Sequence, residues 1–104
     1  MSKVLDDLYQ TILSRKGADA SSSYTASLYA KGTAKIAQKV GEEAVETCIE
    51  ALQGNKDKLK AESADLLYHL LVLWADQGIT PDEVYAVLQS RDGQSGIDEK
   101  NSRE

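Results

Sequence analysis

The sequence predicts an all-α fold, a bundle of four to five helices. Leu and Ala are the commonest of its 104 residues, Glu and Lys are frequent, proline occurs once and phenylalanine is absent, a composition that favours helices. Apolar residues recur at helical spacing, and no stretch of useful length alternates as a strand does. This length fits a single domain over residues 1–104, with a core small enough to gain from a second copy.

The first two predicted helices flank a loop of small polar residues. Residues 3–15 carry Val, Leu, Tyr and Ile side chains on one stripe, and Ser2 can cap their N-terminus. The stretch GADASSSYTAS then indicates a loop that leads into a short helix. We expect Ser22 or Ser23 to cap this helix, which ends near Gly32.

The next two predicted helices are the longest, and the last has the clearest start signal. Residues 33–53 and 56–76 both show helical periodicity, and the breaker QGNKD separates them. A final helix then starts at Thr80, with Pro81 in its first turn and Glu83 completing a capping box.

Charge and cysteine content exclude several classes of protein. A net charge of −5 argues against binding to nucleic acid or to an anionic membrane, which both require Lys and Arg. The single cysteine, Cys48, cannot form an intrachain disulfide, and we expect it to be a small core residue. The longest apolar run, residues 70–75, is too short to span a bilayer, so a cytoplasmic protein is expected. We expect the polar tail, residues 92–104, to be mobile unless it docks.

Four glutamates share one side of the third predicted helix. Among Glu42, Glu43, Glu46 and Glu50, the pairs 42/46, 43/46 and 46/50 lie three or four residues apart. Each like-charge pair at this spacing costs an exposed helix only about 0.2–0.5 kcal/mol. This cost is tolerable, so a solvated face and a functional face are equally consistent with the third helix alone.

The fourth predicted helix makes a functional face more plausible. Glu62, Asp65 and His69 fall within about 60° on a helical wheel, and leucines, a valine and a tryptophan cover most of the remaining surface. A helix that is apolar on all sides is normally buried, so we expect Asp65 to be shut off from bulk water. An unpaired buried carboxylate costs several kcal/mol, so Glu62 and Asp65 require a positive partner.

Three partners are possible: a lysine, His69 or a metal ion. An Asp65–His69 pair would be purely structural and would leave Glu62 unexplained. Two antiparallel helices that each present carboxylates one turn apart would instead converge on one ion, as in metal sites of helical bundles. Oxygen ligands favour Mg²⁺, or Mn²⁺, over zinc.

Cations and hydroxyls precede the acids and could hold a polyphosphate against the metal. Lys39 and Lys35 lie one and two turns, respectively, before the glutamates on the same helical face. A metal with cations and hydroxyls around it suits phosphoryl chemistry, although each lysine alone is as readily explained by solubility. The candidate phosphate-binding residues are Lys35, Lys39, Lys31, Arg15, Ser23 and Thr25.

These motifs resemble a known family. Glu-Glu-x-x-Glu at 42–46 followed by Glu-x-x-Asp at 62–65 is similar to the signature of the all-α nucleoside triphosphate pyrophosphohydrolases, the MazG-like superfamily. The stretches SYTASLYAKGTAKIAQKVGEEAVE, ESADLLYHLLVL and SGIDEKNSR narrow the resemblance to the phosphoribosyl-ATP pyrophosphatases of histidine biosynthesis. It covers residues 15–103, with minor departures in the loop at 18–22 and in the tail.

The resemblance implies a helical homodimer that hydrolyses phosphoribosyl-ATP between its α and β phosphates with Mg²⁺. It implies Glu43, Glu46, Glu62 and Asp65 as metal ligands and Glu42 as a further ligand or water-orienting base, so that Glu42, Glu43 and Glu46 are the candidate catalytic residues. Two alternatives remain at this stage. One is a housecleaning enzyme that acts on free or modified nucleotides, and the other is a non-enzymatic helical dimer.

Overall fold

The protein is all-α, as predicted. The structure is a computed structural model that describes residues 2–93, which contain no strand; the predicted mobile tail lies almost entirely outside the described residues. Its five helices are α1 (Lys3–Ser14), α2 (Tyr24–Lys31), α3 (Thr33–Leu52), α4 (Lys56–Gln77) and α5 (Pro81–Arg91). Within this part of the chain, no helix combines the length and apolar character that crossing a membrane requires.

N-capping side chains define the starts of four of the helices. The side chains of Ser2, Ser23 and Asn55 accept hydrogen bonds from backbone N–H groups in the first turns of α1, α2 and α4, which satisfies donors that a helix start leaves unpaired. The predicted capping box of α5 is present, with Thr80 and Glu83 bonded reciprocally.

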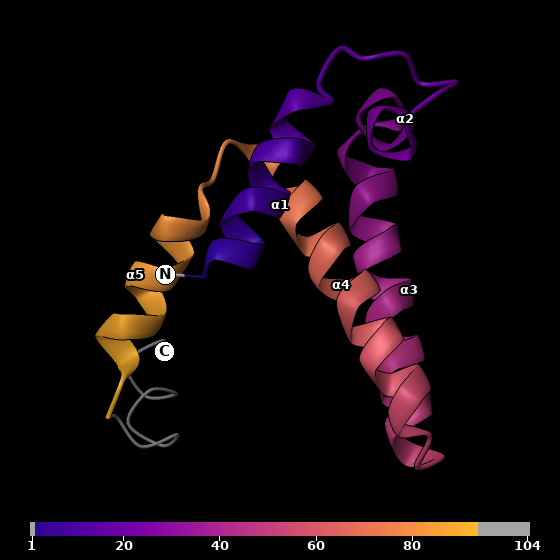
Figure 1. The fold of residues 1–104 in the computed structure, drawn as a ribbon, viewed down its shortest axis with the longest axis vertical. Coiled ribbons are helices and arrows are strands. Elements are labelled where there is room, and N and C mark those ends of the chain that lie inside the picture. The colour runs from indigo at the N-terminus through magenta and orange to yellow at the C-terminus, as the bar shows by residue number, and fades with distance from the viewer. Residues whose placement is uncertain (1, 94–104) are drawn as a thin grey trace.

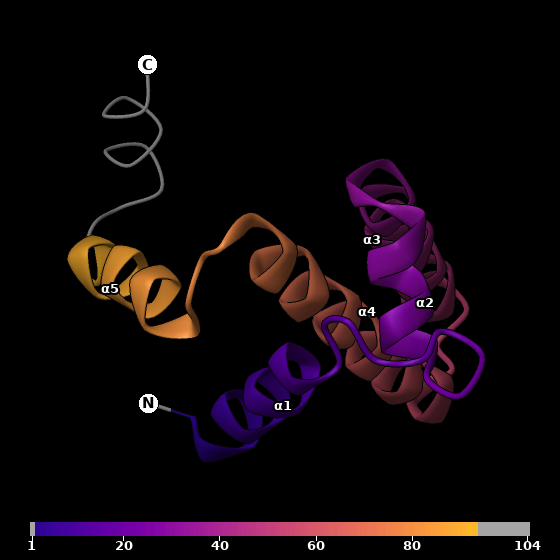
Figure 2. The ribbon, with the colours of Figure 1, turned by 90° about the horizontal axis from the view of Figure 1, so that it is seen from above.

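Helices α3 and α4 form an antiparallel hairpin, and α1 and α2 pack around one end of it (Figure 1). Figure 2 shows α1 beside α4, α2 beside α3, and α5 directed away from the hairpin. The buried core joins α1, α2, α3 and the C-terminal half of α4. Its members are Tyr9, Ile12, Leu28, Ile36, Leu71, Val72 and Ala75.

A single residue, Gly32, separates α2 from α3. It is at once the C-cap of α2 and the N-cap of α3, with φ 94° and ψ 174°. This backbone conformation is essentially restricted to glycine, so the sharp change of direction between the two helices depends on the missing side chain.

Several apolar residues in the C-terminal half of α3 are exposed rather than buried in the single chain. Val45, Ile49 and Leu52 are 59%, 43% and 88% exposed. Cys48 lies among them and is exposed, so the prediction of a small core residue is wrong for the single chain. The reason is that α4 packs against the opposite side of α3, the side that carries Ile36 and Glu43, and leaves these residues uncovered.

Candidate functional site

Three carboxylates from α3 and α4 converge between the two helices. Glu43, Glu62 and Asp65 each offer an oxygen, and the three oxygens lie within 4.8 Å of one another. Glu43 is buried, with 8% of its surface exposed. The spacing of three residues places Glu62 and Asp65 on the same side of α4, and the antiparallel hairpin brings Glu43 opposite them. The structure therefore brings together three of the four predicted metal ligands.

The charge of this cluster is not balanced by protein donors. The Oε2 atom of Glu62 is buried and has no hydrogen-bond partner within the described chain. The contact with the Glu43 carboxylate, followed by burial and the nearby Glu46, raises the pKa of Glu62 to about 7. Burial is the main cause that raises the pKa of Glu43. Without a cation, the Glu62 carboxyl group is therefore about half protonated at pH 7.

The donor set fits a hard divalent cation. Every ligand atom is a carboxylate oxygen, the type that Mg²⁺ and Mn²⁺ prefer. The buried Glu62 oxygen lacks a protein donor, and an unpaired polar atom of this kind indicates a missing partner. A cation in contact with Glu43, Glu62 and Asp65 would satisfy that atom and displace the proton that Glu62 otherwise binds.

The other two motif glutamates lie at the edge of the cluster. Glu46 is exposed, and its carboxylate is close enough to raise the pKa values of both Glu43 and Glu62. Glu42 is exposed and accepts hydrogen bonds from Gln38 Nε2 at 2.7 Å and Lys39 Nζ at 3.2 Å. These bonds, the one from Gln38 first, lower the pKa of Glu42, so this carboxylate is ionised at neutral pH.

The expected burial of Asp65 is wrong for the single chain. Asp65 is exposed, and Leu67 two residues later is 44% exposed. The residues that α4 buries, from His69 to Ala75, all lie in its C-terminal half, where α1 and α2 cover it. The possible Asp65–His69 ion pair is not formed either, because His69 Nδ1 bonds the backbone carbonyl of Asp65 at 2.7 Å.

Two of the candidate phosphate-binding lysines lie beside the acids. Lys39 pairs with Glu42, and this hydrogen bond is the main reason that the pKa of Lys39 is raised, with the nearby Tyr24 adding to it. Lys35 is close enough to contribute to the lowered pKa of Glu42.

The other four candidates lie at or near helix ends. Lys31 and Arg15 are exposed at the C-terminal ends of α2 and α1. Ser23 accepts a hydrogen bond from Ala26 N at 3.1 Å as the cap of α2. Thr25 is buried, and its hydroxyl group is hydrogen-bonded to the Tyr68 hydroxyl. The phosphate-binding roles of all six residues stay predictions.

An aromatic group next to the acids was not predicted as part of the site. The Tyr24 hydroxyl lies 3.0 Å from His69 Nε2, and Tyr68 contacts both rings. The helical position of His69, one turn after Asp65, was the only signal for this group in the sequence. Nothing local links Tyr24 to His69, because they are 45 residues apart.

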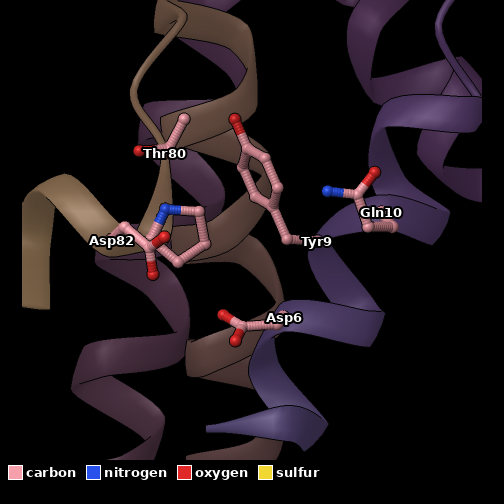
Figure 3. Close-up of a pocket in the computed structure, with 6 residues that line it drawn as sticks. Asp6, Tyr9, Gln10, Thr80 and Asp82 are labelled. Atoms are coloured by element: carbon pink, nitrogen blue, oxygen red, sulfur yellow. The ribbon is translucent and has the colours of Figure 1, made fainter. Parts of the chain in front are cut away.

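A separate pocket of about 330 Å³ lies between α1 and the start of α5 (Figure 3). It is lined by Asp6, Tyr9, Gln10, Thr80, Pro81 and Asp82. The Tyr9 hydroxyl donates a hydrogen bond to the Ile79 carbonyl at 2.7 Å beside it. None of the predicted site residues lines this pocket, so the candidate site is the carboxylate cluster.

Comparisons with known proteins identify the family of this chain. The family model described as phosphoribosyl-ATP pyrophosphohydrolase matches residues 5–92. A phosphoribosyl-ATP pyrophosphatase of Azospirillum brasilense is 64% identical over 100 residues, which cover 96% of this chain and 90% of the relative. One from Paramagnetospirillum magneticum is 63% identical over 102 residues, covering 98% and 94%. The chain therefore belongs to the phosphoribosyl-ATP pyrophosphohydrolase family.

Proposed function

We propose that this protein hydrolyses phosphoribosyl-ATP to phosphoribosyl-AMP and diphosphate, the second step of histidine biosynthesis, in the cytoplasm. The observation that carries the proposal is the convergence of Glu43, Glu62 and Asp65 within 4.8 Å in a member of this family. The relatives that are 64% and 63% identical are named for this activity, and each match spans nearly the whole of both chains.

The cluster would hold Mg²⁺, with Mn²⁺ as a substitute. Glu43, Glu62 and Asp65 supply the ligand atoms, and Glu46 lies close enough to add a fourth carboxylate. When bound, the ion would neutralise charge on the phosphate oxygens of the scissile anhydride. The unpartnered Oε2 atom of Glu62 supports this assignment independently of the family.

Residues beside the metal site would position the attacking water and stabilise the leaving group. Glu42 is ionised and exposed, so its carboxylate can orient the attacking water and accept a proton from it. Lys39 and Lys35 lie beside Glu42 and can balance the negative charge of the departing diphosphate. Holding the water, the anhydride and the leaving group in line accounts for much of the catalysis in phosphoryl transfer.

The active protein would be a homodimer, as the resemblance implies. The exposed arc of Val45, Cys48, Ile49 and Leu52 is a contiguous apolar face, and such faces mark interaction sites. Ile49→Asp would place a charge in this interface. Light scattering after size exclusion should give twice the chain mass for the wild type and a lower mass for the variant. In the dimer, Cys48 should react slowly with a thiol reagent, whereas a fast-reacting monomeric wild type would contradict the proposal.

A product assay tests the activity. The purified chain is offered phosphoribosyl-ATP, ATP and the common dNTPs, each with Mg²⁺ and with EDTA. We expect phosphoribosyl-AMP and diphosphate from the first substrate alone, and only with Mg²⁺. Diphosphate from free nucleotides instead would indicate the housecleaning activity. No turnover of any substrate, with melting insensitive to EDTA, would refute an enzymatic role.

A further inference from the structure

The first turn of α2 is connected to the metal-binding turn of α4 by a chain of hydrogen bonds. The Tyr24 hydroxyl lies 3.0 Å from Nε2 of His69, and Nδ1 of the same ring lies 2.7 Å from the backbone carbonyl oxygen of Asp65. Asp65 is one of the three residues whose carboxylates converge between α3 and α4. The chain therefore ends on the backbone of a metal-ligand candidate.

The direction of these bonds follows from the chemistry of their atoms. A carbonyl oxygen can only accept, so Nδ1 of His69 carries a proton and donates it to the Asp65 carbonyl. In the neutral ring Nε2 is then an acceptor, and the Tyr24 hydroxyl must donate to it. The two hydrogen bonds therefore fix both the tautomer of His69 and the orientation of the Tyr24 hydroxyl group.

Packing holds the His69 ring in place. His69 is 5% exposed, and its ring meets those of Tyr24 and Tyr68 edge to face, with centroids 5.8 and 5.0 Å away. A second link, between the hydroxyl groups of Thr25 and Tyr68, joins the same turn of α2 to α4. The ring cannot turn away from Asp65 without breaking these contacts.

The Asp65 carboxylate is exposed, so its position depends on the backbone that carries it. We propose, on the basis of the function above, that Tyr24 and His69 are positioning residues that hold the Asp65 turn in the geometry needed to bind the divalent cation. They act through Asp65 and do not themselves contact the ion. Partners that orient the ligands of a metal typically change its affinity about 10–100-fold when they are removed.

Manganese binding by the full chain tests this without relying on catalysis. Free Mn²⁺ gives an electron paramagnetic resonance signal that disappears on binding, so a titration yields the dissociation constant. Tyr24→Phe keeps the ring and removes only the hydroxyl. Tyr9→Phe is the matched control, since it removes another tyrosine hydroxyl, one that donates to the Ile79 carbonyl at 2.7 Å. Ile79 follows the C-terminal end of α4, whereas Glu62 and Asp65 lie in the N-terminal half of that helix.

We expect Tyr24→Phe to weaken Mn²⁺ binding about tenfold, and Tyr9→Phe to change it less than twofold. His69→Leu should weaken binding at least as much as Tyr24→Phe. His69→Gln, which keeps one donor and one acceptor, should recover part of the loss. Circular dichroism verifies that each variant is folded, and if His69→Leu does not fold, Tyr24→Phe decides the question.

Equal Mn²⁺ affinity in Tyr24→Phe and Tyr9→Phe would overturn the proposal and leave the hydrogen-bond chain a purely structural feature. Absence of Mn²⁺ binding by the wild type would overturn it as well. A wild type that binds Mn²⁺ but does not hydrolyse phosphoribosyl-ATP would instead refute the proposed function. In that case the Mn²⁺ affinities of the Tyr24 and His69 variants would still decide whether these residues position Asp65.

Discussion

Binding of Mg²⁺ should depend on pH because the ion and a proton compete for Glu62. The pKa of Glu62 is about 7 without a cation, and a ligand carboxylate must be ionised to bind. The ionised fraction is then about 0.1 at pH 6, about 0.5 at pH 7 and about 0.9 at pH 8. Apparent Mg²⁺ affinity should rise about fivefold from pH 6 to 7, but only about twofold from pH 7 to 8.

Isothermal titration calorimetry measures both the affinity and the protons released. Titrations in two buffers of different ionisation enthalpy give the number of protons per bound ion, expected to be about 0.9 at pH 6 and about 0.1 at pH 8. Asp57→Asn removes an exposed carboxylate from the first turn of the same helix and should leave the pH profile unchanged. A pH-independent affinity without proton release would refute the argument from the Glu43–Glu62 contact.

Three other expectations concern activity and stability. Glu46→Gln and Asp65→Asn should each abolish turnover with the circular dichroism spectrum unchanged, whereas Glu50→Ala should retain most of it; full turnover in either of the first two would contradict the metal assignment. In EDTA, the free energy of unfolding should fall as pH rises from about 4.5 to about 7, because the raised pKa of Glu62 makes the folded chain bind more protons than the unfolded chain in this range. Urea unfolding of Glu62→Gln should lack that fall. Ile36→Val, at a position with 0% exposure, should cost about 0.5–1.5 kcal/mol in the same assay, and an unchanged midpoint would contradict its place in the core.

The sequence predicted what depends on local chemistry. Caps such as Ser2 and Thr80 act within one turn, so the helix starts could be inferred from the residues beside them. The convergence of Glu43 with Glu62 and Asp65 was also predictable, because helical spacing places the carboxylates and a short loop makes the two helices antiparallel neighbours.

The burial of individual side chains and the contacts between distant helices could not be predicted from the sequence. Cys48 and Asp65 lie in apolar surroundings along the chain, yet both are exposed in the single chain, because α1 and α2 cover only one end of the α3–α4 hairpin. The hydrogen bond between Tyr24 and His69 needs the placement of α2 against α4, which no local pattern encodes. Sequence periodicity shows which side of a helix is apolar, but not which partner covers it.

A substitution at Gly32, the single residue between α2 and α3, would affect the direction of α2 more than the packing of α3 against α4. A Cβ atom there would meet no neighbour within 4 Å, so Gly32→Ala is not blocked by packing. Its cost lies in the backbone, on the order of 1–3 kcal/mol if φ stays near 94°. The chain would relieve that strain most simply by redirecting α2. Helix α2, which carries Tyr24, would then move away from His69, while Glu43, Glu62 and Asp65 kept their places. A substitution at Gly32 would therefore lower activity although every residue of the acidic motif is still present.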